Sequence, residues 1–294
     1  MIPPGAMFLA GNWLFVACAV LALRGRRLTA PASRSVRREW TPRTAIPALR
    51  RRGVVRRLAA AEYLGRSGNL DAVQALCPLL RDRDRTVRTV AARSLGQIGS
   101  PGAVGPLLDS LTRGGMPQQV VADALVRLGR TARPDLVAAL GHEPPQKRAV
   151  AAEVLGLLRA TDAIPRLVVV LRRDPVPEVK IRATRALGRI GTLSALGPLL
   201  DTARPDLPAA SRAVAARALG HLGDPAATLR LMLLLSDDDY WVAHNAAEAL
   251  ARLGEAGLRP LRAEAAHGTG QAAMHAREAL FLHALRADAA RATV

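Results

Sequence analysis

The six histidines are the first residues to consider for chemistry, because imidazole binds metals and exchanges protons near neutral pH. His142-Glu143 is followed by two prolines in a predicted turn, and one such dipeptide cannot complete a metal site. His244 and Glu248 are four residues apart on a predicted helix, but no third ligand accompanies them. Three more histidines recur every eight residues, at His267, His275 and His283. Eight residues rotate a helix by about 80° beyond two full turns, so these three do not line up, and the sequence predicts no metal and no cofactor.

Motifs of the common enzyme classes are also missing from the sequence. It contains no G-x-x-x-x-G-K-[ST] phosphate loop, no G-x-G-x-x-G dinucleotide fingerprint and no G-x-S-x-G nucleophile elbow. Cys18 and Cys77 form neither a C-x-x-C pair nor a disulfide framework. We therefore expect a protein without catalytic residues.

One cluster near the C-terminus is suited to recognition of a partner. An acidic turn leads into two adjacent aromatic residues, in a chain with only 3% aromatic residues. Because Tyr and Trp are enriched at binding hot spots, we expect a partner-contact site here. Its predicted residues are Asp237, Asp238, Asp239, Tyr240, Trp241 and His244. The alternative is ordinary helix capping, because Asp239 aligns with Asp84 of another repeat and acids stabilise helix N-termini.

A repeated pentapeptide, Leu-Gly-x-apolar-Gly, organises most of the chain. Its strict and softened copies end at residues 68, 99, 129, 159, 191, 223 and 254. The intervals are 31, 30, 30, 32, 32 and 31 residues, and so regular a period predicts a repeat protein.

Each repeat is predicted to be a pair of helices. Residues 85–95 place apolar side chains at helical spacing, and Gly99 supplies the left-handed conformation that commonly closes a helix. A second helix follows, with a proline in its first turn where the missing N–H costs nothing. These prolines are Pro106, Pro134, Pro165, Pro198 and Pro260. No single pair can bury its apolar face alone, so neighbouring pairs must stack, and residues 274–284 predict a capping helix at the end.

The segment Asp84–Gly99 reads D-x-x-V-R-x-x-A-A-x-x-L-G-x-I-G. This pattern resembles the short HEAT-like repeats of bacterial proteins, of the type found in phycobilin lyases. The resemblance extends over roughly residues 48–285. It implies an all-α solenoid of about seven helix pairs plus a terminal capping helix, and it leaves the task of the protein open.

An uncharged apolar stretch opens the chain. Residues 1–23 carry no charged side chain, and residues 7–23 are the most apolar part. This length is at the short end for a membrane-spanning helix, and the arginines that follow predict a cytoplasmic continuation. We therefore expect a single-pass protein of the cytoplasmic membrane with its N-terminus outside; a cleaved signal and a soluble helix are the alternatives. The expected parts are an anchor (1–23), a basic linker (24–47), the solenoid (48–285) and a tail (286–294).

Positive charge is concentrated beside this stretch. The net charge is +18, and residues 24–57 hold twelve arginines and a single acid, Glu39. Arginine at an inner leaflet attracts anionic lipid, so lipid contacts are predicted. The residues are Arg24, Arg26, Arg27, Arg34, Arg37 and Arg38. A solvated linker is an equal alternative.

A basic ladder also recurs within the repeats. One repeat position is occupied by Arg57, Arg88, Arg148, Lys180 and Arg212. The resemblance to HEAT-like repeats implies that these side chains bond neighbouring turns, with an anion-binding stripe as the alternative.

The leading hypothesis for function is a membrane-tethered scaffold that offers the concave surface of its second helices to protein partners. One alternative is a basic nucleic-acid-binding protein, but the repeats carry only a thin excess of positive charge. The other is an accessory protein or chaperone of the phycobilin-lyase type. No small-molecule substrate is expected.

Overall fold

The computed structural model describes residues 40–113 and 115–292. The chain divides into two compact units, Met1–Thr44 and Ala45–Val294. Helix α3 (Pro42–Ala48) begins in the first unit, of which only residues 40–44 are described. The predicted anchor (1–23) and the six arginines predicted to contact lipid therefore lie outside the described residues.

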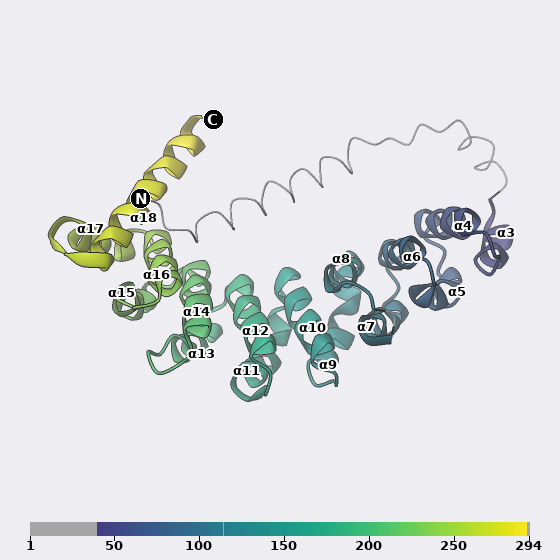
Figure 1. Ribbon diagram of the computed structural model, residues 1–294, viewed down its shortest axis with the longest axis horizontal. Coiled ribbons are helices and arrows are strands. Elements are labelled where there is room, and N and C mark those ends of the chain that lie inside the picture. The colour runs from purple at the N-terminus through teal and green to yellow at the C-terminus, as the bar shows by residue number, and fades with distance from the viewer. Residues whose placement is uncertain (1–39, 114, 293–294) are drawn as a thin grey trace. The chain divides into compact units, whose positions relative to one another are not determined.

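Helix pairs build the second unit throughout its described part (Figure 1). The first helices of the pairs are α4 (Val54–Ser67), α6 (Arg85–Ile98), α8 (Gln118–Leu128), α10 (Pro145–Leu157), α12 (Pro177–Ile190), α14 (Ala209–Leu222) and α16 (Tyr240–Arg252). The second helices are α5 (Ala72–Leu76), α7 (Val104–Arg113), α9 (Arg133–Ala139), α11 (Ile164–Arg173), α13 (Leu196–Thr202), α15 (Thr228–Leu235) and α17 (Glu255–His267). A terminal helix, α18 (Gly270–Ala292), follows the last pair. The predicted all-α solenoid of seven helix pairs with a terminal helix is confirmed.

Helix α6 shows how the repeat sequence produces its first helix. The Asp84 carboxylate accepts hydrogen bonds from the backbone N–H groups of Thr86 (2.8 Å) and Val87 (3.2 Å), which caps the N-terminus. Gly99 ends the helix with a φ of 76°, a conformation that costs glycine little. Val87 and Leu95 are fully buried between these ends, so one face of the helix enters the core.

Prolines begin most of the second helices as predicted. Pro134 and Pro165 are the second residues of α9 and α11, and Pro106 and Pro198 are the third residues of α7 and α13. Pro260 differs because α17 begins directly after Gly254, without the short 3₁₀ turn that precedes α7, α9, α11, α13 and α15. It therefore lies inside its helix.

Successive first helices approach each other very closely. A Cβ atom added to a glycine of one helix would come within 2.6–2.8 Å of an alanine or serine of the next helix. The pairs are Gly65–Ser94, Gly96–Ala124, Gly156–Ala186, Gly188–Ala218 and Gly220–Ala249. The row with the closest spacing must be the inner row of a curved stack. The first helices therefore form the inner row, and the prediction that the second helices do so is wrong (Figure 1).

One junction in the inner row lacks this glycine contact. In the repeat register, Val126 of α8 stands at the glycine position and Val154 of α10 at the facing small-residue position. α8 and α10 pack against each other less extensively than the other neighbours in the row. The larger side chains hold these two helices apart.

The predicted location as a single-pass membrane protein has to be corrected. Among the described residues, no helix is long and apolar enough to cross a membrane. The longest of these helices, α18, carries both acidic and basic residues, including Glu278 and Arg286, whose transfer into hydrocarbon is costly.

Candidate anion-binding site

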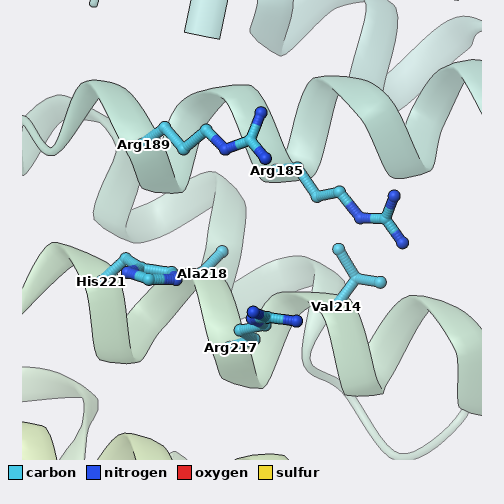
Figure 2. Close-up of a pocket in the computed structure, with 6 residues that line it drawn as sticks. All are labelled: Arg185, Arg189, Val214, Arg217, Ala218 and His221. Carbon is cyan, nitrogen blue, oxygen red and sulfur yellow. The ribbon is translucent and has the colours of Figure 1, made fainter. Parts of the chain in front are cut away.

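One of the two closest helix contacts of the inner row is surrounded by positive side chains. Gly188 of α12 is flanked by Arg185 and Arg189, while Ala218 of α14 is flanked by Arg217 and His221. These four basic residues, which we call the basic cluster, lie on the exposed side of the two helices (Figure 2). Because no side chain separates the helices here, the four basic groups are brought together.

The basic cluster lines a shallow hollow of about 260 Å³, together with Val214 and Ala218. A second hollow of about 310 Å³ adjoins it and shares Arg189 and His221. The second hollow adds Arg159 and the half-exposed Leu157. The two hollows together offer positive charge beside a small apolar surface.

Three arginines of the basic cluster have no carboxylate partner in the described part of the chain. Arg185, Arg189 and Arg217 make no ion pair and no hydrogen bond there. The nearest acids serve other arginines: Arg182 pairs with Glu153.

Glu248, the acid on the α16 side, is engaged in the same way. It accepts a hydrogen bond from Arg286 at 2.8 Å and lies 3.7 Å from Arg252. The positive charge of the basic cluster therefore stays uncompensated.

Side-chain ionisation in the basic cluster reflects this excess of positive charge. Partial burial, with repulsion from Arg182, Arg189 and Arg217, lowers the pKa of Arg185 below its usual value, against an opposing effect of Glu178. The pKa of His221 is lowered by burial and by Arg252, Arg217 and Arg189, against a smaller opposing effect of Glu248. An anion bound here would relieve the repulsion.

Guanidinium groups suit carboxylates and phosphates, because their planar N–H donors bind two oxygens at once. The basic cluster presents three such groups and an imidazole on two adjoining helices. It can bind an anionic group in a fixed place, and the neighbouring Leu157 can contact an apolar side chain beside it.

Two of the three acids predicted to contact a partner, Asp237 and Asp239, accept hydrogen bonds within the chain. Asp237 accepts two hydrogen bonds from the Arg212 guanidinium, at 2.7 and 2.8 Å, and its side chain is almost buried. Asp239 caps α16 by accepting from the N–H groups of Trp241 and Val242. Asp238 is exposed. The capping alternative therefore describes Asp239.

The aromatic residues of the same predicted site are exposed. Tyr240 and Trp241 keep 48% and 51% of their surface accessible, and their rings meet edge to face at 5.2 Å. His244 stacks on Tyr240 at a centroid distance of 5.7 Å. Tyr240 and Trp241 are accessible to a partner, whereas the His244 side chain is only 19% exposed.

Three members of the basic ladder, Arg57, Arg148 and Arg212, form ion pairs with an acid about 25 residues further along the chain, whereas Lys180 forms none in the described part of the chain. Arg148 binds Asp174 through two hydrogen bonds of 2.7 and 3.0 Å, and Arg57 binds Asp82 at 2.9 Å. Arg88 donates instead to the Asp82 carbonyl oxygen. These arginines bond neighbouring turns, as predicted, and are not free to bind an external anion.

The basic cluster was missed at the level of sequence. Its signal is present, because its four residues occupy only two positions of the repeat: Arg185 aligns with Arg217, and Arg189 with His221. The alignment alone does not identify a site. The structure shows in addition that the side chains at these two repeat positions are exposed on the inner row of helices.

The fold and the repeat pattern together define a class of protein. The family model for HEAT repeats matches residues 42–128, 133–208 and 196–280, so the chain belongs to the HEAT-repeat family.

Two curated relatives are similar over about half of this chain. A HEAT repeat-containing taxis protein of Halobacterium salinarum is 35% identical over 150 residues, which cover 49% of this chain and 34% of that protein. Phycocyanobilin lyase subunit alpha of a Nostoc species is 35% identical over 141 residues, which cover 48% of this chain and 45% of the subunit. The chain thus matches less than half the length of either relative.

The solved structure of Kap121p shares the fold. It aligns with a TM-score of 0.54 and 14% identity, over 71% of this chain and 29% of Kap121p.

Proposed function

We propose that this protein is a non-catalytic binding scaffold whose inner row holds an acidic segment of a protein partner at the basic cluster. The proposal depends on one observation: Arg185, Arg189 and Arg217 share a hollow and have no carboxylate partner in the described part of the chain. Uncompensated arginines at close range repel one another, so a ligand with carboxylates gains both attraction and relief of that repulsion.

The arrangement of charge along the inner row favours a short acidic segment over a long polyanion. At the repeat position of Arg185 and Arg217, the helix on either side carries an acid, Glu153 in α10 and Glu248 in α16. A nucleic acid needs positive charge along its whole backbone path, which these acids interrupt. Leu157 and Val214 beside the basic cluster further suit a peptide with apolar side chains.

A binding measurement with the full chain tests the proposal. The probe is a fluorescein-labelled ten-residue peptide of alternating Glu and Leu, read by anisotropy, with a Lys–Leu peptide and single-stranded DNA of equal charge as comparisons. The variant R185Q/R189Q/R217Q should bind the Glu–Leu peptide about tenfold or more weakly. The matched control, R130Q/R173Q/R259Q, removes the same charge from exposed arginines outside the basic cluster and should bind normally.

Two results would overturn the proposal. If both triple variants bound the Glu–Leu peptide equally weakly, net charge alone would explain the effect. Tighter binding of the DNA than of the peptide, lost in the R185Q/R189Q/R217Q variant, would assign the basic cluster to nucleic acid.

A second candidate function is an accessory role of the phycobilin-lyase type. It is favoured by the 35% identity to phycocyanobilin lyase subunit alpha, over 48% of this chain. Incubation of the full chain with phycocyanobilin should then give a shifted, protein-bound absorption band after gel filtration. An unchanged spectrum would remove this candidate and leave the binding scaffold.

A further inference from the structure

A second cluster of side chains, which are of the types that bind metal ions, lies where the last helix packs against the last repeat. His244 projects from α16, while His275 and Glu278 project from α18. One ligand atom from each residue lies within 4.8 Å of the other two. The Glu278 Oε2 atom is 3.7 Å from His244 Nδ1 and 3.9 Å from His275 Nδ1. Both separations are too long for hydrogen bonds.

His275 provides an independent indication that the cluster binds something. Only 1% of this residue is exposed, and its Nδ1 atom makes no hydrogen bond. A buried polar atom without a partner is costly, and native proteins almost always satisfy such atoms. A metal ion between the three side chains would bind this nitrogen.

The protonation of His275 is compatible with such a role. Burial lowers its pKa below the usual histidine value, against a smaller opposing effect of Glu278. A lowered pKa favours the neutral imidazole, the form that has a lone pair for a metal.

The donor set selects the kind of ion. Zn²⁺ accepts imidazole nitrogen and carboxylate oxygen at about 2.0–2.2 Å, which places ligand atoms of a tetrahedron about 3.3–3.5 Å apart. The two separations from Glu278 Oε2, 3.7 and 3.9 Å, exceed this by a few tenths of an ångström, and the ligand atoms of the two histidines lie within 4.8 Å of each other. Side-chain rotations close that gap, and a water molecule can complete the tetrahedron. Two nitrogens and one carboxylate do not suit Mg²⁺ or Ca²⁺, which prefer oxygen ligands.

We propose that His244, His275 and Glu278 form a zinc site that fastens the terminal helix α18 to α16. Tyr240 lies against both histidine rings, at centroid distances of 5.7 Å from His244 and 5.0 Å from His275. This ring covers one side of the site and limits the orientations of the imidazoles. The site is independent of the basic cluster, so failure of either proposal leaves the other in place.

Sequence spacing pointed to a different carboxylate for His244. Glu248 lies four residues after it on α16, but its carboxylate is held by Arg286 and Arg252. Glu278 takes this place because α18 packs against α16. His267 and His283 do not belong to the cluster.

Zinc binding by the full chain, prepared without a histidine tag and stripped with EDTA, tests the proposal. Isothermal titration calorimetry should give one Zn²⁺ per chain, and Co²⁺ should give the visible absorption of a tetrahedral site. The variants H244N and E278Q should each bind Zn²⁺ at least about tenfold more weakly. The control H283N, which changes an exposed histidine of the same helix, should bind like the parent.

A thermal measurement separates binding from folding. Zn²⁺ should raise the Tm of the parent chain and of H283N by several degrees, and at the same concentration it should raise that of E278Q by clearly less. Circular dichroism of the metal-free variants checks that they fold. Absence of stoichiometric binding in the parent, or equal affinity of H244N and H283N, would overturn the zinc site.

Discussion

Gly188 of α12 lies so close to Ala218 of α14 that an added Cβ would come within 2.6 Å of the Ala218 Cβ and 2.7 Å of its Cα. Real Cβ atoms do not approach this closely, so the contact requires glycine. The same contact places Arg185 and Arg189 of α12 next to Arg217 and His221 of α14. Helix packing and the candidate site therefore depend on one missing side chain.

Substitution of Gly188 by alanine is expected to force α12 and α14 apart. The free energy of unfolding in urea should fall by about 1–3 kcal/mol, as for other overpacked contacts. The control is Gly197→Ala in α13, where an added Cβ meets nothing within 4 Å. This substitution should raise stability by about 0.5–1 kcal/mol, because alanine loses less backbone freedom on folding. If both substitutions changed the free energy of unfolding equally, the close contact at Gly188 would not contribute to stability.

Arg159 occupies a position where most repeats have glycine. Its φ is 47°, and no other non-glycine residue of the described chain has a positive φ. Because a left-handed conformation costs an L-residue about 1–2 kcal/mol, Arg159→Gly should raise the free energy of unfolding by about 1 kcal/mol. Arg159→Ala keeps the unfavourable φ and should give no such gain. A gain of the same size in the alanine variant would assign the effect to the side chain.

The ion pair between Arg148 and Asp174 is the most deeply buried in the described chain. The two side chains are 7% and 3% exposed, and the hydrogen bonds from Arg148 to Asp174 raise the pKa of the arginine. Asp174→Ala leaves the buried cation with only the exposed Glu143, whose Oε1 lies 2.9 Å from Arg148 Nη1, so stability should fall by about 3 kcal/mol.

Two comparisons test the explanation for Asp174. The double variant R148M/D174L removes both charges and should be more stable than Asp174→Ala. Asp201→Ala, which breaks the exposed pair between Arg172 and Asp201, should change stability by no more than about 0.5 kcal/mol. A loss in the double variant as large as in the single one would contradict the role of the stranded charge.

His221 should make anion binding dependent on pH. Burial and the surrounding arginines lower the pKa of this residue, whereas Glu248 opposes them, so the free chain holds the ring neutral at pH 7. A bound carboxylate favours the protonated ring and raises the pKa. Affinity for the Glu–Leu peptide should therefore increase as pH falls from about 7.5 to 5.5, before the peptide carboxylates protonate.

The variant H221Q checks the origin of this pH dependence, because glutamine retains polarity and cannot titrate. Its affinity should be flat over the same pH range. If the affinity of H221Q depended on pH as strongly as that of the parent chain, a group other than His221 would be responsible.

Much of the fold could be predicted from the period alone. The glycine at the end of most first helices and the proline near the start of most second helices fix both boundaries locally, as Gly99 and Pro106 illustrate. Curvature was not predictable in this way. It depends on contacts between repeats, such as Gly156 with Ala186, and a sequence does not state which faces meet.

The candidate sites could not be predicted for the same reason, because they also depend on which helix faces meet. His244 and His275 are 31 residues apart on different helices, so no spacing rule along one helix could join them. In contrast, the capping role of Asp239 was available as an alternative, because it involves only the N–H groups of the next turn. Local hydrogen bonds could be predicted from the sequence, and packing between helices could not.

The valine pair at the α8–α10 junction has a consequence for cooperativity. In a stack of repeats, each repeat is stabilised by its contacts with the neighbouring repeats. Val126 and Val154 weaken these contacts at the α8–α10 junction. The helices on the two sides of the junction can therefore unfold locally with different free energies of opening. Backbone amides of α4–α9 should then exchange hydrogen as one group, and those of α10–α18 as another.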